Sequence, residues 1–430
     1  MARGHLAADP ADLRWMSAAI ALARRGRGRV APNPAVAALI VRDGRLLARG
    51  LTAPGGRPHA EAEALLALAK AGENAVGATV YVTLEPCAHH GRTPPCADAL
   101  LAAGVVRVVC PMIDPDPRVA GRGIARLRAA GIEVTVGLLG DEAAAVNDGF
   151  LSVITRSRPA LSLKLATTLD GRIATRTGES RWITGPAARL RVHAMRAEAD
   201  AILIGAGTAR ADDPMLDVRG LGPDAPQPLR VVADPRLTLP PDGKLATTAH
   251  RHPAAVLCRG GAGHGEAVEA RASILKGLGV RLLEVAPGAD DTQPSAAVDD
   301  GGDVLGTTAG IVRDHGAVIA AQAGSPGHIT DHGQGMLLSP EAMLGRLASE
   351  GVNSVFCEGG GRLAGALMAD GLVDRLITVT AGVGIGSDGV PSLGPMGISR
   401  LAGVPRFRLV DLERLGEDVI AEWSPACGGG

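Results

Sequence analysis

Runs of strand-forming residues alternate with runs of helix-forming residues along this chain, and the alternation begins again near residue 157. The apolar run Val36–Val41 precedes an Ala/Leu/Glu-rich helical stretch at 60–71, and further strand and helix signals follow to about residue 136. After Ser157-Arg158-Pro159 the same order recurs. Strands that alternate with helices favour a mostly parallel sheet covered on both faces. The sequence therefore predicts two α/β domains, residues 1–156 and residues 157–430.

Composition limits the partners that such a chain can bind. Of the 430 residues, 46% are hydrophobic and 21% are charged, which is typical of a folded chain and excludes wholesale disorder. The formal net charge is −1, so no global positive field attracts nucleic acid. Three Phe, three Trp and one Tyr offer few stacking platforms for single-stranded bases. We therefore expect no nucleic-acid partner.

The sequence also indicates the compartment. No run approaches the roughly 18 to 20 consecutive apolar residues that span a bilayer, and the N-terminus lacks the order of a secretory signal. Six Cys in 430 residues are too sparse for a disulfide scaffold. We expect a chain without a membrane partner, in the reducing cytoplasm.

Residues 287–336 differ from their surroundings. They contain ten Gly and seven Asp and no Phe, Trp or Tyr. Such a segment buries too little apolar surface to form a core, so a mobile surface insertion is favoured over a functional lid.

One group of residues in the first half has the composition of a zinc site. His59 and Glu61 open a predicted helix, Pro86-Cys87 follows a predicted strand, and Cys96 begins the next helix. One imidazole and two thiolates would leave the fourth position of a tetrahedral zinc open for water, whose pKa the metal would lower to about 7. Glu61 is not needed as a ligand and is the candidate to move protons between that water, a ring nitrogen and a leaving amine.

Each of these elements alone is commonly structural, since a buried Cys usually packs as a small hydrophobe. Their order and spacing together favour the chemical interpretation. The signature resembles the cytidine-deaminase superfamily. It departs from nucleic-acid-editing members, which use a Cys-x-x-Cys pair, because eight residues separate Cys87 from Cys96.

The longer spacing narrows the resemblance. The run T-L-E-P-C-A-H-H-G-R-T-P-P-C, with P-N-P around Asn33 and D-P-D-P-R-V-A-G-R-G from Asp114, is similar to the riboflavin-pathway pyrimidine deaminase over most of residues 10–150. That resemblance implies a three-layer αβα fold and assigns the metal to His59 and the two thiolates. His89 and His90 remain alternative ligands or substrate contacts. Ala37 stands where the family usually has Gly.

Two other features of the sequence, a basic run and the remaining cysteines, have no assigned chemistry. The basic run of Arg24, Arg25, Arg27 and Arg29 is either a solvated face or a phosphate contact. The remaining cysteines have no partner spacing and are expected to be packing or surface residues: Cys110, Cys258, Cys357 and Cys427.

Two glycine-rich turns characterise the second half. A strand, a glycine-containing turn and a helix occur around Gly205 and again around Gly359-Gly360-Gly361. Such turns let backbone approach a phosphate at a helix N-terminus, although many contain Gly only for its backbone freedom. The spacing is not that of a dinucleotide-binding G-x-G-x-x-G. A bound nucleotide is thus an open alternative from the residues alone.

Taken together with L-K-L-A-T-T-L-D-G-R-I-A and I-L-I-G-A-G-T-A-R-A-D-D-P, these turns resemble the dihydrofolate-reductase-like reductase domain of bifunctional riboflavin enzymes. The resemblance implies NADPH as cofactor and the following cofactor-binding positions: Ala166, Trp182, Thr208, Asp212, Gly360, Gly361, Arg362, Leu363, Ala364, Gly365 and Ala366. It implies substrate-binding positions at Ser180, Arg196, Leu216, Arg219 and Glu358. Arginines and a hydroxyl suit a ribose phosphate, and Trp182 would offer nicotinamide a flat wall.

The leading hypothesis is a bifunctional riboflavin-pathway enzyme. It would deaminate 2,5-diamino-6-(5-phosphoribosylamino)pyrimidin-4(3H)-one with zinc and then reduce the ribosyl side chain to ribityl with NADPH. The resemblance also implies a homo-oligomer, a dimer or tetramer. One alternative is a nucleic-acid-editing or other nucleobase deaminase with a non-catalytic C-terminal domain. Another keeps the deaminase but makes the second domain a regulator.

Overall fold

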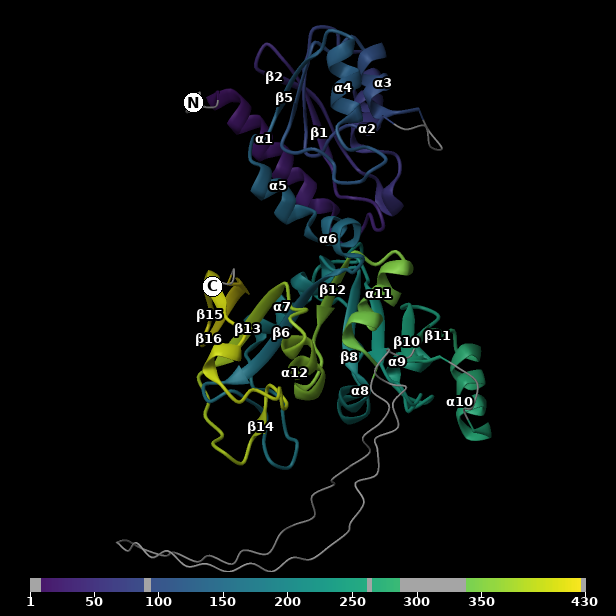
Figure 1. Cartoon of the computed structure of the whole chain (residues 1–430), viewed down its shortest axis with the longest axis vertical. Helices are drawn as coiled ribbons and strands as arrows, with labels where there is room; N and C mark the ends of the chain where they lie inside the picture. Colours follow the sequence, from purple (N-terminus) through teal and green to yellow (C-terminus); the bar gives the residue numbers. More distant parts are fainter. Residues whose placement is uncertain (1–8, 89–93, 261–264, 287–337, 427–430) are drawn as a thin grey trace, which may run out of the picture.

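Two β-sheets, one after the other along the chain, organise the molecule (Figure 1). The computed structural model describes residues 9–88, 94–260, 265–286 and 338–426. In Figure 1 the first sheet and its helices form the upper part, the second sheet forms the lower part, and helix α6 lies between them. The sequence segment 287–336, predicted to be an insertion, lies outside the described residues.

The first sheet has the strand order β2-β1-β3-β4-β5. β1 is antiparallel to both of its neighbours, whereas β3, β4 and β5 run parallel. Four of the five strands therefore run in the same direction, as expected for a mostly parallel sheet, and β1 alone opposes them. Asp43 and Gly44 both have positive φ, which makes a tight hairpin and returns β2 beside β1 in the opposite direction. The strands are β1 (Ala37–Arg42), β2 (Arg45–Leu51), β3 (Thr79–Val82), β4 (Arg107–Cys110) and β5 (Glu133–Val136).

Helices cover both faces of this sheet. Successive side chains of β1 point to opposite faces, so Leu39 packs in a core with Met16 of α1, while Ile40 packs in another with Leu68 of α2. These two cores make the three-layer αβα arrangement that the resemblance implies. The helices are α1 (Pro10–Ala23), α2 (Ala60–Lys70), α3 (Cys96–Ala102), α4 (Arg122–Ala129) and α5 (Gly140–Val146), with 3₁₀ turns at Arg24–Gly26 and Pro54–Gly56.

The second sheet has nine strands in the order β11-β10-β9-β8-β12-β6-β13-β16-β15. Neighbours from β11 to β13 run parallel, and β16 and β15 add an antiparallel edge. The strands are β6 (Ala160–Thr168), β8 (Ala201–Gly205), β9 (Leu229–Ala233), β10 (Ala254–Arg259), β11 (Arg281–Val285), β12 (Ser354–Cys357), β13 (Arg375–Ala381), β15 (Phe407–Leu415) and β16 (Asp418–Pro425). A separate short ladder pairs β7 (Arg172–Ala174) with β14 (Val390–Pro391).

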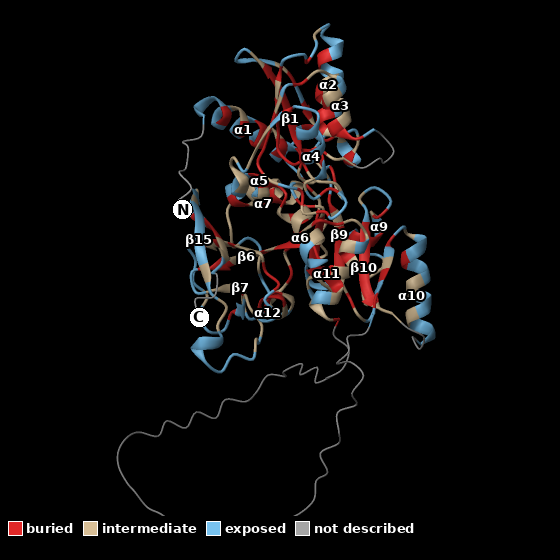
Figure 2. Cartoon of the chain, turned by 45° about the horizontal axis from the view of Figure 1, so that its top comes forward, coloured by how far each residue is buried: buried red, intermediate tan, exposed pale blue. Residues whose placement is uncertain are grey.

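The central strands of this sheet are buried on both sides (Figure 2). Leu203 packs with Leu344 of α11 and Leu367 of α12, whereas its neighbour Ile204 packs with Leu275 of α10. Parallel strands with both faces covered read as continuous apolar runs, as they do in this sequence. The helices are α7 (Pro186–Ala197), α8 (Ala206–Asp212), α9 (Lys244–Thr247), α10 (Glu266–Gly277), α11 (Pro340–Ser349) and α12 (Gly361–Ala369), with a 3₁₀ turn at Leu401–Gly403.

Helix α6 (Asp148–Arg156) connects the two sheets. Asp374, which precedes β13, accepts hydrogen bonds from Arg156 at 2.6 Å, from Arg158 at 2.7 Å and from the Leu161 backbone at 2.8 Å. One carboxylate thus ties the end of the connecting helix to the start of β6. No helix among the described residues has both the length and the apolar character to cross a membrane.

Candidate active sites

Three donor atoms from two helix starts converge in the first domain. His59 is the residue before α2, Cys96 is the first residue of α3, and Cys87 lies in the segment that follows β3. His59 Nδ1 lies 3.4 Å from Cys96 Sγ and 3.7 Å from Cys87 Sγ. The structure brings together the three residues that the sequence proposed as metal ligands.

This geometry fits a tetrahedral zinc ion. Zinc–sulfur bonds of about 2.3 Å and zinc–nitrogen bonds of about 2.1 Å at tetrahedral angles separate neighbouring donors by roughly 3.5 to 3.8 Å. All three donor atoms lie within 4.8 Å of one another. The backbone N–H of Cys96 donates to Cys87 Sγ at 3.3 Å, so a helix start also favours negative charge on that sulfur. The donor set can hold zinc without rearrangement of the fold.

The two thiols are not equivalent. Hydrogen bonding with Cys96 lowers the pKa of Cys87 to about 4, against the opposing effect of burial. The same contact, together with burial, raises the pKa of Cys96. Hydrogen bonding to Cys87 raises the pKa of His59. A negative charge is therefore already favoured at Cys87. The positive charge of a divalent cation would favour ionisation of the second thiol, that of Cys96.

Glu61 lies one residue inside α2 and is buried, with 4% of its surface exposed. Burial raises the pKa of Glu61 to about 7. A carboxyl group with a pKa near neutrality can both accept and release a proton, as a general acid–base group must. It lines the same cavity as His59 and Cys87. Its position suits the proton-transfer role predicted from the sequence.

The cavity beside these residues has a volume of about 160 Å³. Its wall opposite α2 belongs to the loop 114–121, which a single carboxylate anchors. Glu85 accepts hydrogen bonds from the backbone of Asp114, Gly121 and Gly123 at 3.1, 2.8 and 2.9 Å. A Cβ at position 123 would lie 1.9 Å from the Pro86 carbonyl oxygen, so this position requires glycine. The D-P-D-P-R-V-A-G-R-G motif thus shapes the cavity wall.

Several cavity residues were not identified as site residues from the sequence: Asn33, Arg57, Asp114, Asp116 and Arg118. Burial raises the pKa of Asp114 to about 6, and Arg118 pairs with Asp116 at 2.5 Å. Asn33 and the residues from Asp114 to Arg118 lie within the P-N-P and D-P-D-P-R motifs, and this position could have identified them as cavity residues. His89 and His90 lie outside the described residues, so their proposed roles remain predictions.

The basic run after α1 is not a uniformly solvated face. Arg27 is largely buried, bonds to the Ala145 carbonyl oxygen at 3.1 Å, and pairs with Asp148 and Glu198 at 3.8 and 3.6 Å. Arg29 donates to the Asp224 carbonyl oxygen at 2.9 Å. These arginines join the two domains. Cys110, Cys258 and Cys357 are buried free thiols, as expected, and Cys427 lies outside the described residues.

The second domain has a buried ionic cluster at the carboxyl end of β12. Arg196 of α7 donates two hydrogen bonds to Glu358, at 2.5 and 3.1 Å, and Lys164 of β6 lies 3.6 Å from the same carboxylate. Burial alone would raise the pKa of Glu358, but the charges of Arg196 and Lys164 lower it to about 2. Burial lowers the pKa of Lys164. Two cations and one carboxylate therefore meet at the edge where α/β sheets bind ligands.

Lys164 was not identified from the sequence. It is a single charged residue between Leu163 and Leu165, which are buried in the sheet. The charge of Lys164 within the L-K-L-A run could have identified it, because a lysine in a central strand requires a partner.

The two glycine-rich turns of the second half meet in the structure. The Gly360 backbone donates to the Thr208 hydroxyl at 3.1 Å, which joins the start of α12 to α8. At Gly361 and Gly365, however, the close neighbour is the chain itself. A Cβ at position 361 would lie 2.9 Å from the Pro391 carbonyl oxygen, and a Cβ at position 365 would lie 3.0 Å from the Gly394 carbonyl oxygen. These two glycines make room for the segment 391–394, whereas Gly360 faces Thr208.

The other predicted reductase residues occupy varied positions. Trp182 is 69% exposed and stacks under the Arg189 guanidinium, 4.4 Å from its ring centroid. The Asp212 carbonyl oxygen accepts a hydrogen bond from Arg181 at 2.9 Å. Leu216 is buried in the core beside β9, and Arg219 is exposed and pairs with Asp217 at 3.1 Å. Ala166 and Ser180 are half-buried, as are Leu363 and Ala366, whereas Ala364 is buried and Arg362 exposed. None of these residues has a contact with Glu358 like that of Arg196.

Family models match both halves of the chain. The cytidine and deoxycytidylate deaminase zinc-binding region matches residues 10–112, and the RibD C-terminal domain matches residues 159–262 and 297–421. The chain is 38% identical to riboflavin biosynthesis protein RibD of Escherichia coli (strain K12) over 420 residues, 95% of this chain and 98% of that protein. It belongs to the RibD family. The RibD of Haemophilus influenzae is 36% identical over 429 residues, covering 96% of this chain and 97% of that protein.

Solved structures agree with this membership. A deaminase/reductase of Thermotoga maritima superposes with a TM-score of 0.74 at 30% identity, covering 97% of this chain and 99% of its own. Acinetobacter baumannii RibD superposes with a TM-score of 0.73 at 33% identity, with the same coverage. The chain is thus a bifunctional deaminase and reductase of riboflavin biosynthesis that uses zinc and NADPH. A nucleic-acid-editing deaminase with a non-catalytic appendage is not favoured.

Proposed function

We propose that residues 1–156 deaminate 2,5-diamino-6-(5-phosphoribosylamino)pyrimidin-4(3H)-one and that residues 157–430 then reduce its ribosyl side chain to ribityl. The observation that carries the proposal is the convergence of His59, Cys87 and Cys96 beside buried Glu61 in a chain that also has the Glu358 cluster. The Thermotoga relative is described as a diaminohydroxyphosphoribosylaminopyrimidine deaminase and 5-amino-6-(5-phosphoribosylamino)uracil reductase, which supports these substrates.

In the deaminase site, His59, Cys87 and Cys96 would hold zinc, which supplies Lewis-acid chemistry and lowers the pKa of water. Glu61 would accept the two protons of water in turn at its carboxylate, and would pass the first to the ring nitrogen and the second to the departing amine. Arg57 lies on the cavity wall, where its guanidinium could contact the substrate phosphate, whereas Arg118 on the same wall is paired with Asp116.

In the reductase site, NADPH supplies the hydride, and the protein holds the substrate and cofactor. Arg196 and Lys164 keep Glu358 ionised, so its carboxylate can accept hydrogen bonds from ribose hydroxyls or a ring N–H. We propose substrate contacts at Ser180, Arg196, Leu216, Arg219 and Glu358. We propose cofactor contacts at Ala166, Trp182, Thr208, Asp212 and residues 360–366, where Arg362 and Trp182 are exposed and accessible to a ligand.

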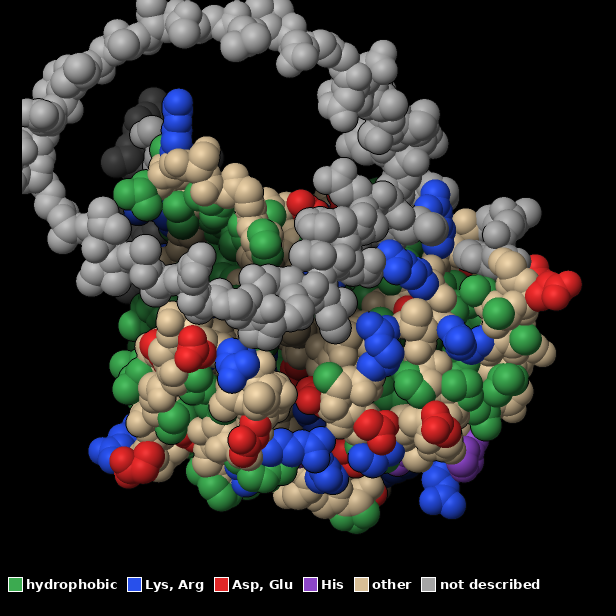
Figure 3. Space-filling view, turned by 90° about the horizontal axis from the view of Figure 1, so that it is seen from below, with side chains coloured by type: hydrophobic (Ala, Val, Ile, Leu, Met, Phe, Trp, Pro, Cys, Tyr) green, Lys and Arg blue, Asp and Glu red, His purple; other side chains and the backbone are tan. Residues whose placement is uncertain are grey.

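We further propose a homo-oligomer, a dimer or tetramer, in the reducing cytoplasm. The edge strand β15 exposes Leu409, Val410 and Leu412, an apolar row that a second copy could cover. Free thiols at the zinc site require a reducing compartment. A small-molecule substrate is supported by the size of the cavity. On the part of the face that the described residues form in Figure 3, acidic and basic side chains are interspersed, unlike a nucleic-acid-binding surface.

The test uses the full zinc-loaded chain and two purified substrates. We expect the diaminopyrimidine to lose its amine without NADPH, and the deaminated compound to be reduced only with NADPH. Failure of the deaminated compound to oxidise NADPH in a single-turnover experiment would leave the second domain as a regulator.

A further inference from the structure

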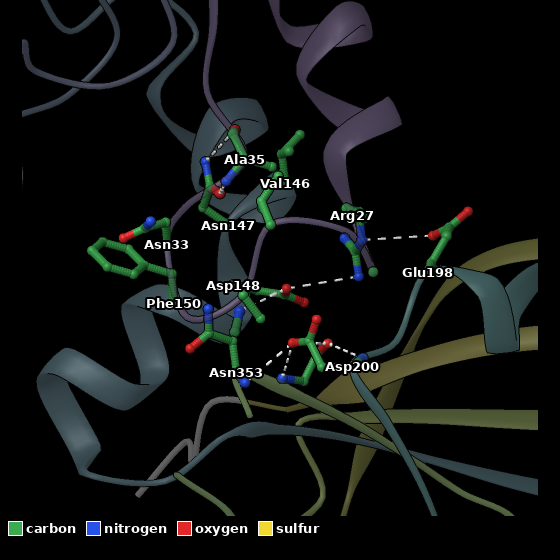
Figure 4. Close-up of a pocket in the computed structure, with 15 residues that line it drawn as sticks. Arg27, Asn33, Ala35, Val146, Asn147, Asp148, Phe150, Glu198, Asp200 and Asn353 are labelled. Atoms are coloured by element: carbon green, nitrogen blue, oxygen red, sulfur yellow. Dashed lines mark hydrogen bonds and ion pairs between the residues drawn. The ribbon is translucent and has the colours of Figure 1, made fainter. Parts of the chain in front are cut away.

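The loop that carries Asn33 lies between the two domains, although Asn33 itself lines the deaminase cavity. Gly28 packs so closely on the end of α7 that a Cβ there would lie 2.2 Å from the Ala197 carbonyl oxygen. Gly351 of the reductase domain faces Pro32, because a Cβ at position 351 would lie 3.5 Å from the Pro32 Cβ. In Figure 4 the loop passes between the helices of the first domain and the strands of the second. A deaminase-site loop is therefore in contact with the reductase sheet.

Two asparagine side chains fix this loop on either side of Asn33. Asn147, at the junction of α5 and α6, accepts from the Ala35 N–H at 2.7 Å and donates to the Ala35 carbonyl oxygen at 3.1 Å (Figure 4). Asn353 Nδ2, from the reductase domain, donates to the Pro32 carbonyl oxygen at 3.0 Å. Asn33 lies between these two attachments, and its side-chain amide donates to the Gly56 carbonyl oxygen at 2.9 Å.

Asn353 is itself held firmly by the reductase sheet. Its backbone N–H donates to the Asp200 carboxylate at 3.1 Å, and its carbonyl oxygen accepts from the Ala160 N–H at 2.9 Å. Only 7% of its surface is exposed. It directly precedes β12, the central strand that ends at the Glu358 cluster. The position of the Asn353 backbone is therefore set by the sheet, and its side chain reaches from there to the loop.

We propose that Asn353 of the reductase domain is a positioning residue for the deaminase, acting through Pro32 and Asn33. This rests on the proposed function, since Asn33 lines the cavity that would take the phosphoribosyl pyrimidine. The contact fixes the carbonyl that precedes Asn33, and hence the place of the Asn33 amide in the cavity. The reductase domain thus completes the deaminase site by a hydrogen bond rather than by a reacting group.

Asn353→Asp tests the proposal, because it keeps the side-chain shape but sets a carboxylate oxygen against the Pro32 carbonyl oxygen. We expect deaminase kcat/KM to fall roughly tenfold, as for loss of a buried hydrogen bond. Zinc content should be unchanged, and reductase kcat/KM with supplied deaminated substrate should stay within about twofold. Thr378→Val is the control, because it removes a side-chain hydrogen bond within the reductase sheet, that of Trp423 Nε1 to the Thr378 hydroxyl at 3.2 Å, from a strand other than β12. It should leave both activities within about twofold.

A double-mutant cycle with Asn33→Ala separates positioning from general damage. If Asn353 acts through Asn33, the two losses will be less than multiplicative in the double variant. Independent, multiplicative losses would overturn the proposal, as would an equal fall in the reductase. Unchanged deamination in folded Asn353→Asp would overturn it too. Asn353→Ser, which removes the donor without repulsion, gives the same tests if the aspartate variant does not fold.

Amide hydrogen exchange gives a readout that does not depend on the assigned substrate. In Asn353→Asp, peptides covering residues 24–35 should exchange faster, whereas peptides from β6 should not change. If the wild-type chain did not deaminate the diaminopyrimidine, the proposed function would fail while this result still tested the contact. Unchanged exchange in residues 24–35 would overturn the positioning role.

Discussion

The two active sites are built in opposite ways. The deaminase site takes its three metal donors from one short stretch, residues 59–96, and places two of them at helix starts. The proposed reductase site is assembled from distant parts of the chain, because Arg196 and Glu358 are 162 residues apart. The first site gathers a donor set that fits a metal ion, whereas the second pairs its charges within the protein. We therefore expect the deaminase to depend on bound metal, and the reductase to depend on the sheet that holds Arg196, Lys164 and Glu358 together.

The largest effect is expected for Cys96→Ser, which removes one of the two thiolates. Stoichiometric zinc and deamination should be lost together, because the remaining donors cannot complete the site. Reduction of supplied deaminated substrate should persist. Metal analysis and two initial-rate assays measure this, with Cys110→Ser as a control for a buried thiol in the same domain. Full deamination by a zinc-free Cys96→Ser protein would refute the metal site.

Glu61→Gln should sharpen the comparison by removing the proton carrier while leaving the metal donors. Deamination should fall by about 10²- to 10⁴-fold, the usual contribution of a general acid–base group. Zinc content and NADPH oxidation with the deaminated substrate should match the wild type. Glu63→Gln, two residues along the same helix, is the control and should have little effect. A reductase loss as large as the deaminase loss would contradict two separate sites.

Glu358→Gln is the reciprocal change. It leaves Arg196 and Lys164 facing each other without their counter-charge, and we expect reductase kcat/KM to fall by about 100-fold or more. Deamination should stay within about twofold. Separate initial rates for the two substrates measure this. Equal losses of both activities would show that the cluster supports the whole fold rather than the reductase.

The wild-type protein and Glu358→Gln should also differ in how their stability depends on pH. The pKa of Glu358 is lowered to about 2, below its ordinary value of about 4.3 in an unfolded chain. The folded state therefore gains stability from this carboxylate at pH values above its unfolded pKa, and loses it as the pH falls toward 2. Urea unfolding should show a difference between wild type and Glu358→Gln that is constant above about pH 5.5 and shrinks below about pH 4.5. A difference independent of pH would contradict the ionic role.

The smallest effect is expected for the segment between the two halves of the reductase. Joining Pro287 to Leu337 through a short Gly/Ser linker should leave both activities within about threefold, because the composition of 287–336 suits no packed core. A reductase loss beyond about tenfold, with deamination intact, would instead assign the segment a part in the reductase.

The sequence predicted the deaminase donors because the chemistry and the helix starts coincide in one local motif. Most strands of both sheets also followed from their apolar runs. The reductase cluster was only partly predictable, since Lys164 resembles an ordinary outward-facing residue until its distance to Glu358 is known. The contact of Asn353 with Pro32 joins residues 321 apart, and no local pattern encodes such a pairing. The β1–β2 hairpin is encoded locally by Asp43-Gly44. The antiparallel pairing of β1 with β3 joins strands that are separated by a helix, and it has no such local signal.

The most direct test of the central claim follows the products of the wild-type enzyme by mass spectrometry. The diaminopyrimidine is supplied with zinc-loaded protein, once without NADPH and once with it. The two-site account predicts a product that has only exchanged its amine for oxygen in the first case, and the same change plus addition of two hydrogens in the second. Accumulation of a reduced product that still carries both amino groups of the diaminopyrimidine, or no reduction with NADPH present, would contradict the account.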